Sequence, residues 1–378
     1  MNRAAHPRLA DVARVAGVSL ATASRALFQP LLVREDTRER VRAASQMLGY
    51  VPHGAARALA SRRSHTIGAV FPPVDNPIFA SGTHALAREL ATAGYTLLLA
   101  SHDYDLEAEL QATRVLVERG AEGVVLVGNE HLPETFAVLA RVGVPYELTW
   151  SVDPGGLHHS VGLSHRRASQ ACTRHLLDLG HREIAVLAGD TRHNDRAAER
   201  LAGVRDALAG YGLELPPARL VELSFSVANG RSGMARLLDG GAGFTALVAG
   251  NDPLALGAWL ECQARGIAVP AAMSIVGFDD IELAGLMGPG LTTVHVPSAE
   301  IGRLAAQRLL ARLAGHSVPR TLELPGPLVV RGTTAPPGTA APPPSPVAAP
   351  GSRGGSRSAR RPVAEAAPIP PLRAPRRR

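Results

Sequence analysis

Short apolar runs alternate with stretches of helical periodicity through the middle of the chain. The helical stretches, such as THALARELATAG and DPLALGAWLECQARG, each close at a glycine of the kind that adopts the left-handed C-cap. The predicted strands are TIGAVF (66–71), TLLLA (96–100), GVVLV (123–127), VPYEL (144–148), IAVLA (184–188), ALVA (246–249) and MSIVGF (273–278). Apolar strands that alternate with helices indicate parallel sheets covered on both faces.

This alternation runs through two similar halves of the middle segment. We therefore predict an α/β body of two doubly wound lobes that face each other. Ligands of such folds bind at the carboxyl ends of the strands. The expected ligand site is thus the cleft between the lobes.

The segment before the body has an all-helical pattern. Gly17 permits a tight turn, and Ser19 is a suitable N-cap for a second helix over Leu20–Leu27. A third helix is expected over EDTRERVRAASQMLGY. The apolar residues at helical spacing are Leu9, Val12, Ala13 and Ala16 in the first helix and Val41, Ala44 and Leu48 in the third. This pattern predicts a helix-turn-helix.

In a helix-turn-helix the N-terminal residues of the second helix enter the major groove of double-stranded DNA. Arg25 can pair with guanine through two hydrogen bonds, while Thr22 and small apolar side chains suit the thymine methyl group. The residues expected at the major groove are Ser19, Leu20, Ala21, Thr22, Ser24 and Arg25. The alternative is an ordinary helical hairpin with a solvated basic face.

The segment VPHGAARALASRRS (51–64) joins this head to the body and is too short and polar to form its own core. We expect it to order as a short helix only on a partner, with two copies from a dimer in the minor groove. Leu59 would wedge into a base step, with Ala56 and Arg57 on the same surface and Arg57 on the backbone. The alternative is that Leu59 is a plain packing residue.

Charge is distributed unevenly along the chain. Residues 1–63 carry a net charge of +7, residues 64–335 carry −7 and residues 336–378 carry +7. A basic head on an acidic body favours docking of one end on a polyanion. The Pro- and Arg-rich segment 336–378 is predicted to be a disordered tail, either solvated or a sequence-independent phosphate binder, and it has no apolar heptad.

Several function classes are disfavoured by what the sequence lacks. It has no Lys, which removes Schiff-base and P-loop lysines, and no nucleophile elbow or HExxH motif. Cys172 and Cys262 are far apart, so we expect two buried thiols and neither a disulfide nor a metal site. These absences predict that the protein is not an enzyme and has no cofactor.

The sequence also predicts a cytoplasmic, nucleoid-associated protein without a membrane partner. No apolar run approaches the roughly 18–20 residues of a spanning helix, and Asp11 and Arg14 interrupt what would be the apolar part of a signal peptide. A solute-binding protein of a sugar transporter is the alternative that the body alone would allow. The basic head speaks against it.

Ten motifs in order resemble the lactose repressor (LacI/GalR) family, in nearly continuous register from Leu9 to Thr334. They are LADVARVAGVSLATASRAL, TRERV, LGYVP, ARALASRRSHTIGAVFP, NPIF, LGHREIAVLAG, RLAGVRDAL, NDPLALGA, SIVGFDD and LTTV. The resemblance implies a homodimeric repressor of carbohydrate or sugar-acid metabolism. An effector bound between lobes of periplasmic-binding-protein type would order or melt the hinge helices and so control operator affinity.

The resemblance also implies domain boundaries. The DNA-binding domain would span 1–50, the hinge helix and linker 51–64, the effector-binding and dimerisation domain 65–335 and the tail 336–378. The first lobe is expected over 65–163 and 296–320, and the second over 164–291 and 321–335. Phe28 and His53 depart from the family's usual Asn, and His is a poor N-cap for the hinge helix.

The family's effector contacts fall on Phe79, Arg200, Asn251 and Asp279. A Phe face would cover the apolar side of a sugar, and the other three would pair with its polar groups. Each has a plainer alternative: a core position for Phe79, a solvated helix position for Arg200, a helix N-cap for Asn251 and a turn for Asp279.

One further stretch resembles the gluconate-type repressors of the family. The second lobe begins with Ser164 and His165 where the family usually has Asp-Asn, and ELTW ends in Trp150. Arg200, His165 and Trp150 would suit a sugar acid, because a guanidinium can hold a carboxylate through two parallel hydrogen bonds. The expected effector is therefore a sugar or a sugar acid.

Overall fold

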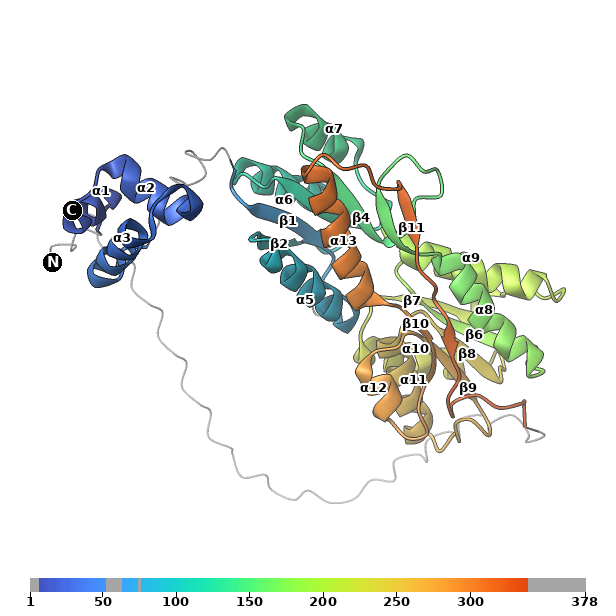
Figure 1. Cartoon of the computed structure of the whole chain (residues 1–378). Helices are drawn as coiled ribbons and strands as arrows, with labels where there is room; N and C mark the ends of the chain where they lie inside the picture. Colours follow the sequence, from blue (N-terminus) through green and yellow to red (C-terminus); the bar gives the residue numbers. More distant parts are fainter. Residues whose placement is uncertain (1–6, 52–62, 74–75, 339–378) are drawn as a thin grey trace, which may run out of the picture. The chain divides into compact units, whose positions relative to one another are not determined.

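The computed structural model of the protein describes residues 7–51, 63–73 and 76–338 (Figure 1). The N-terminal domain consists of helices. Its elements are α1 (Leu9–Ala16), α2 (Leu20–Phe28), the 3-10 helix η1 (Pro30–Leu32) and α3 (Glu35–Leu48). Gly17 has a φ of 66° and donates its N–H to the α1 carbonyl of Ala13, which ends the helix in the left-handed conformation. The side chain of Ser19 accepts a hydrogen bond from Thr22 N at 3.1 Å. The predicted helix-turn-helix is confirmed, with a second helix one residue longer than expected.

The body contains two six-stranded sheets, which confirms the predicted pair of α/β lobes, although fewer strands were predicted than the sheets contain. In the first sheet the strand order is β11-β5-β4-β3-β1-β2, and all pairings are parallel. These strands are β1 (Thr66–Phe71), β2 (Thr96–Ser101), β3 (Gly123–Val127), β4 (Tyr146–Ser151), β5 (Ser160–Leu163) and β11 (Thr321–Glu323). The helices of this lobe are α5 (Pro77–Thr92), α6 (Leu106–Glu118), α7 (Pro133–Val142) and α13 (Ser298–Leu313).

Helices cover both faces of the first sheet (Figure 1). Ile67 of β1 belongs to a core with Leu86 of α5 and Leu309 of α13. Val70 of the same strand belongs to a separate core with Leu116 of α6. Successive residues of a strand point to opposite faces, so Ile67 and Val70 lie on opposite faces of the sheet. Since each belongs to a core, β1 is buried on both faces. This arrangement confirms the doubly wound prediction for the first lobe.

The second sheet has the order β12-β10-β9-β8-β6-β7, in which β12 alone is antiparallel to its neighbour among the described strands. Its strands are β6 (Ile184–Gly189), β7 (Leu220–Leu223), β8 (Ala246–Ala249), β9 (Ser274–Asp279), β10 (Thr292–His295) and β12 (Leu328–Val329). Its helices are α8 (His165–Asp178), α9 (Asp195–Ala209), α10 (Val227–Asp239), α11 (Asp252–Ala264) and α12 (Glu282–Leu286), with η2 (Pro217–Arg219) before β7. The left-handed glycines that close the predicted helices are confirmed at Gly94, Gly120, Gly180 and Gly266.

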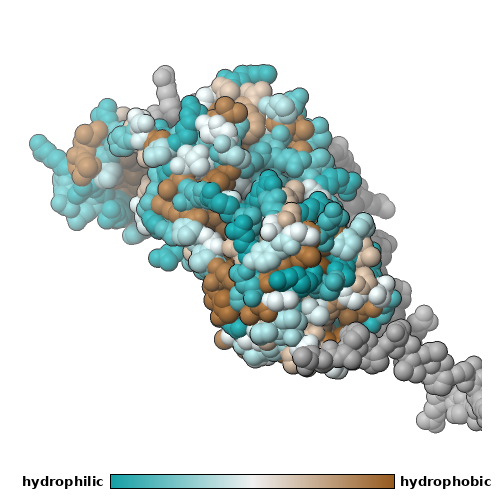
Figure 2. All heavy atoms as spheres, turned by 90° about the vertical axis from the view of Figure 1, so that its right-hand side faces the viewer, coloured by the Kyte–Doolittle hydropathy of each residue, from teal (hydrophilic) through white to brown (hydrophobic). Residues whose placement is uncertain are grey.

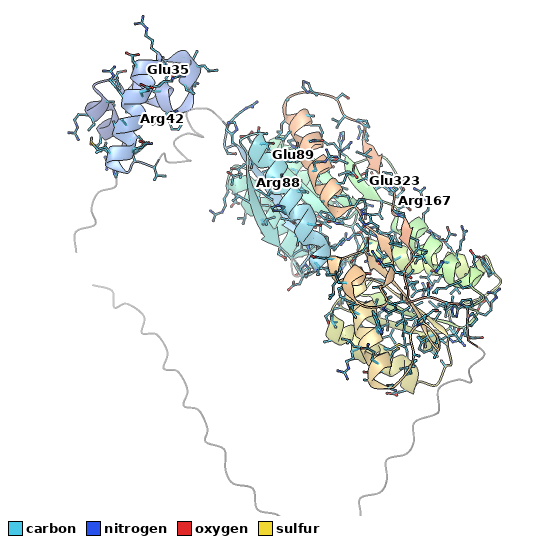
Figure 3. The ribbon with its side chains drawn as sticks, turned by 60° about the horizontal axis from the view of Figure 1, so that its bottom comes forward. Glu35, Arg42, Arg88, Glu89, Arg167 and Glu323 are labelled. Atoms are coloured by element: carbon cyan, nitrogen blue, oxygen red, sulfur yellow. The ribbon has the colours of Figure 1, made fainter. Side chains whose placement is uncertain are left out.

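The chain crosses between the lobes at positions that differ from the expected boundaries. Residues 292–295 form β10, which pairs with β9 in the second sheet. Residues 321–323 form β11, which pairs with β5, so they belong to the first lobe. The assignment of all of 321–335 to the second lobe was therefore wrong. β11 is three residues long, and its place depends on pairing with a distant strand rather than on its own pattern. Arg167 of α8 forms an ion pair with Glu323 of β11 beside this crossing (Figure 3).

Among the described residues, no helix combines the length and the apolar character that crossing a membrane requires. On the face drawn in Figure 2 the surface is mostly hydrophilic, with apolar patches between the hydrophilic areas.

Candidate functional site

The outer face of α2 carries the residues expected to contact DNA bases. Leu20, Ala21 and Arg25 are exposed, whereas Ala23 and Ala26 pack into the core of the head. The remaining predicted major-groove residues are the exposed N-cap Ser19 and the half-buried Thr22 and Ser24. Arg25 is the long polar side chain that this face presents. The predicted hinge residues Ala56, Arg57 and Leu59, and His53, lie outside the described residues.

A pocket lies between the two lobes of the body, at the carboxyl ends of strands from both sheets. The first lobe contributes Asn76, Ile78, Phe79, Tyr104 and Trp150 to its lining. The other lining residues are His165, Arg196, Arg200, Phe225, Asp279 and Val296. The structure thus brings together all the predicted effector residues except Asn251.

Aromatic rings form the first-lobe wall of this pocket. Phe79 and Trp150 lie edge to face with ring centroids 5.2 Å apart, and Phe71 packs edge to face against both from beneath. Trp150 has a φ of 63°, unusual for a residue inside a strand. A Cβ at Gly82 would lie 2.5 Å from the Trp150 ring, so glycine is needed there. Phe79 therefore packs in the core and lines the pocket at once.

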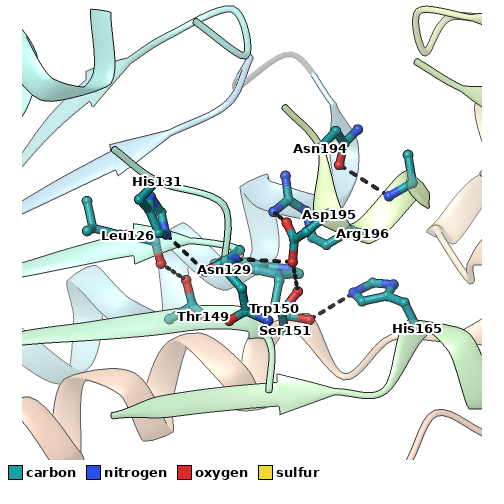
Figure 4. Close-up of polar contacts among 12 residues, drawn as sticks. Leu126, Asn129, His131, Thr149, Trp150, Ser151, His165, Asn194, Asp195 and Arg196 are labelled. Carbon is teal, nitrogen blue, oxygen red and sulfur yellow. Dashed lines mark hydrogen bonds and ion pairs between the residues drawn. The ribbon is translucent and has the colours of Figure 1, made fainter. Parts of the chain in front are cut away.

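His165 begins α8 and faces the same pocket. Its Nε2 lies 2.8 Å from the carbonyl oxygen of Trp150 (Figure 4), and a carbonyl can only accept, so Nε2 carries the proton. Burial lowers the pKa of His165 well below its usual value, with Arg200 and Arg196 acting in the same direction. The ring is therefore neutral. Its Nδ1 is an acceptor that is buried without a partner among the described residues.

Arg200 and Asp279 face each other across the second-lobe side of the pocket. An Nη1 of Arg200 is 3.9 Å from Oδ1 of Asp279, which is beyond hydrogen-bond distance. The guanidinium lies over the rings of Phe278 and Phe225, at 4.8 and 5.5 Å from their centroids. Arg200 is 8% exposed, so the solvated alternative is wrong.

The electrostatics of this pair are set mainly by burial. Burial raises the pKa of Asp279 well above its usual value, and attraction to Arg200 offsets only part of that effect. A carboxyl group with a raised pKa can stay protonated and donate a hydrogen bond. The Nε of Arg200 and the Nε1 of Trp150 are donors buried without partners among the described residues. The pocket thus offers donors and an acceptor at which hydrogen bonds remain to be made.

The lobes also contact each other directly beside the pocket (Figure 4). Oδ2 of Asp195, at the start of α9, accepts hydrogen bonds from Asn129 N at 3.1 Å and Ser151 Oγ at 2.8 Å. Its Oδ1 accepts from Arg196 at 2.8 Å. Asn129 and Ser151 follow or end strands of the first lobe, so one carboxylate joins the two lobes. We call this the Asp195 latch.

Several residues that line the pocket were not predicted from the sequence. Arg196 lies one turn before Arg200 on α9, and this spacing places both on one helix face, so it was a usable signal. Tyr104 and Phe225 lie in loops and offered no comparable pattern.

Asn251 is a helix N-cap, which is one of its two expected roles. Its Oδ1 accepts a hydrogen bond from Leu254 N at 3.0 Å and caps α11, while its Nδ2 is buried without a partner among the described residues. Asn251 is not among the residues that line the pocket, and its contact with an effector stays a prediction.

The two cysteines, and any groups that could bind a metal ion, could carry other chemistry. Cys172 and Cys262 are both buried, and burial raises the pKa of each thiol to about 12. Within residues 7–51, 63–73 and 76–338, no group of His, Cys, Asp and Glu is arranged to hold a metal ion.

Comparison with known proteins supports both domains. Residues 8–53 match the family described as "Bacterial regulatory proteins, lacI family", and residues 173–334 match the "Periplasmic binding protein-like domain". A Streptomyces limosus protein described as an uncharacterized HTH-type transcriptional regulator in the aml 5' region is 37% identical over 87% of this chain and 95% of its own length. The HTH-type transcriptional regulator GntR of Pseudomonas aeruginosa is 34% identical over 82% of this chain and 91% of its own length.

Solved structures agree with these sequence matches. The lac repressor dimer bound to operator and the anti-inducer ONPF is 29% identical with a TM-score of 0.77, and the match covers 87% of this chain and 99% of that one. A solute-binding protein, the alternative that the body alone allowed, is set aside because the DNA-binding domain also matches. The chain belongs to the LacI family of bacterial regulatory proteins, and it is a DNA-binding transcriptional regulator controlled by a small-molecule effector rather than an enzyme.

Proposed function

We propose that this regulator acts as a repressor of carbohydrate or sugar-acid metabolism and that its effector is a sugar acid. The observation that carries the proposal is the set of buried groups with unmade hydrogen bonds around the pocket. Arg200 Nε, Trp150 Nε1 and His165 Nδ1 have no partners among the described residues. A ligand that forms hydrogen bonds with these groups gains affinity and specificity from them.

The charges in the pocket favour an anionic ligand over a neutral one. Arg196 already pairs with Asp195, while Arg200 faces a carboxyl group whose pKa burial raises. Because burial raises the pKa of Asp279, this carboxyl group compensates the charge of Arg200 less than an ordinary carboxylate would. A ligand carboxylate would restore the balance, and Arg200 is a residue type suited to hold it.

The remaining lining suits the carbon skeleton and hydroxyls of such a ligand. Neutral His165 would accept a hydrogen bond from a hydroxyl, and the faces of Phe79 and Trp150 would cover the apolar side.

A neutral sugar is the second candidate for the effector. A solved relative, 28% identical with a TM-score of 0.64, is a complex of the transcriptional regulator CelR with cellobiose. The proposal therefore needs a test in which only the carboxylate differs. D-gluconate and D-glucose provide that pair, with cellobiose as a third arm.

The test is a thermal-shift titration followed by calorimetry. A ligand at about 100 times its Kd stabilises a protein by about 2.7 kcal/mol, so a stabilising aldonate gives a clear rise in Tm. We expect stabilisation by D-gluconate or a related aldonate and little by D-glucose. Stabilisation by the neutral sugars alone would contradict the proposal.

For the DNA side we propose a homodimer that binds a double-stranded operator on the nucleoid, in the cytoplasm. Arg25 and its neighbours on α2 would read bases, and Ala56, Arg57 and Leu59 would occupy the minor groove. Exposed apolar side chains support association of two copies: Leu286 of α12 is 73% exposed and Val330 is 57% exposed. Light scattering of the full chain, with and without a selected operator duplex, tests the dimer.

A further inference from the structure

The chain makes a strained corner where β9 ends at the effector pocket. Asp279 and Asp280 have φ values of 116° and 57°, so two successive residues other than glycine adopt left-handed backbone conformations. Such conformations cost free energy and persist only where surrounding contacts hold them. At this corner the Asp279 side chain lies beside Arg200, and the Asp280 side chain pairs with Arg331 and His295 at 2.6 and 3.0 Å.

Asp252 is a buried residue that forms a hydrogen bond with the backbone directly after this corner. It follows the N-cap of α11 and is fully buried. Its Oδ2 accepts a hydrogen bond from Ile281 N at 2.9 Å, directly after the corner. Its Oδ1 accepts from Thr293 Oγ1 of β10 at 2.6 Å. One carboxyl group therefore joins α11, β10 and the segment that leaves β9.

The packing around Asp252 is specific to this arrangement. A Cβ at Gly277 of β9 would lie 2.3 Å from Oδ1 of Asp252, so glycine is what allows the carboxyl group to approach the strand. Asp252 does not line the pocket, whereas Asp279 does. Any influence of Asp252 on a ligand must therefore pass through the corner.

We propose that Asp252 is a positioning residue of the effector site, which fixes the 279–281 corner and thereby sets where the Asp279 carboxyl group lies relative to Arg200. The inference rests on the proposed role of Asp279 in binding the effector. The carboxyl group suits this task because two donors from different elements converge on it, one for each oxygen. An apolar side chain would leave both the Ile281 N–H and the Thr293 hydroxyl without this partner.

The first test compares crystal structures of wild type, Asp252→Ala and Asp252→Asn. In Asp252→Asn the side-chain oxygen can still accept from Ile281 N while its amide donates to Thr293 Oγ1, so we expect the corner to stay. In Asp252→Ala we expect the φ angles of Asp279 and Asp280 to relax and the Asp279 carboxyl group to move away from Arg200. An unchanged corner in Asp252→Ala would overturn the proposal.

The second test measures D-gluconate binding by calorimetry on the same full-length proteins. Loss of a residue that orients a binding group typically costs about 10- to 100-fold in affinity at metal sites, and we expect a loss of that order in Asp252→Ala. Affinity in Asp252→Asn should stay within about threefold, a change worth under about 0.7 kcal/mol. Thr293→Val removes one donor and keeps the carboxyl group, so it provides an intermediate case if Asp252→Ala folds poorly.

Thr333→Val is the matched control. Thr333 is also fully buried, donating to Ile275 O at 2.7 Å and accepting from Thr292 N at 2.9 Å, at the opposite end of β9 and β10. It should lower Tm without changing D-gluconate affinity. Equal losses of affinity in Thr333→Val and Asp252→Ala would show a general structural effect and overturn the proposal.

A double substitution separates this inference from the proposed function. If Asp252 acts through Asp279, adding Asp252→Ala to Asp279→Ala should cause little further loss of affinity. A full additional loss would contradict the positioning role. If wild type does not bind D-gluconate at all, the proposed ligand class fails, while the crystal structures still decide whether Asp252 holds the corner.

Discussion

Arg200 and Asp279 face each other 3.9 Å apart in the effector pocket, with side chains 10% and 5% exposed and no hydrogen bond between them. The distance leaves room for a ligand group to hydrogen-bond with both. Burial raises the pKa of Asp279 despite the nearby guanidinium. This geometry supports the proposal that the pair binds a ligand.

Replacing Arg200 by Gln should abolish the effector response and spare DNA binding. The change removes the charge-assisted hydrogen bonds to a ligand carboxylate, each worth about 1.5–3 kcal/mol, so we expect a loss of at least about tenfold in D-gluconate affinity. Operator affinity without effector, measured by fluorescence anisotropy, should remain unchanged. Arg205→Gln alters an exposed residue of the same helix and should have no effect on either. Equal loss of DNA binding in Arg200→Gln would refute this division of roles.

Replacing Arg25 by Ala should weaken binding to the selected operator. Loss of a bidentate guanine contact costs about 1–3 kcal/mol, or roughly 5- to 150-fold in affinity. The loss should be much smaller on duplexes of scrambled sequence. Arg42→Ala, on the exposed side of α3 (Figure 3), removes the same charge and should change affinity for both duplexes alike. A uniform loss in Arg25→Ala would show that Arg25 contacts phosphate instead.

Breaking the Asp195 latch should favour separation of the lobes. Asp195→Ala removes the acceptor shared by Asn129 N and Ser151 Oγ, and the loss of these two hydrogen bonds should shift the equilibrium toward separated lobes. The radius of gyration in small-angle scattering should increase when no effector is present. Ser151→Ala removes one of the two contacts and should have a smaller effect. An unchanged radius would show that the latch does not hold the lobes.

The pH dependence of stability should reveal the ionisation of Asp252. Burial raises its pKa from 3.8 to about 7. The folded protein then keeps a proton that the unfolded chain has lost, so stability falls as pH rises between about pH 4 and pH 7, by up to about 1.4 kcal/mol per pH unit.

Asp252→Asn removes this titration, so the variant should gain stability relative to wild type as pH rises from about 4 to about 7, with little further change above that. Urea denaturation of both proteins at several pH values measures the difference. A difference that is constant with pH would contradict the raised pKa.

Features that depend on neighbours in the chain could be predicted from the sequence. Gly17 and Ser19 determine the turn and the cap of the helix-turn-helix within a few residues. The strand runs of the body were predicted for the same reason, because buried parallel strands need continuous apolar side chains. The shorter strands β5, β7, β10, β11 and β12 were not, since they depend on partners elsewhere in the fold.

The order of residues thus determined the family, the two domains and most candidate pocket residues, whereas the contacts within the pocket required the tertiary structure. Asn251 and Asp252 are adjacent, and one caps a helix while the other supports the corner at Asp279. Asp195 and Ser151 meet only because the chain crosses between the lobes. The physical reason is that burial and convergence of distant groups determine whether a polar side chain caps a helix, pairs with another group or remains available for a ligand.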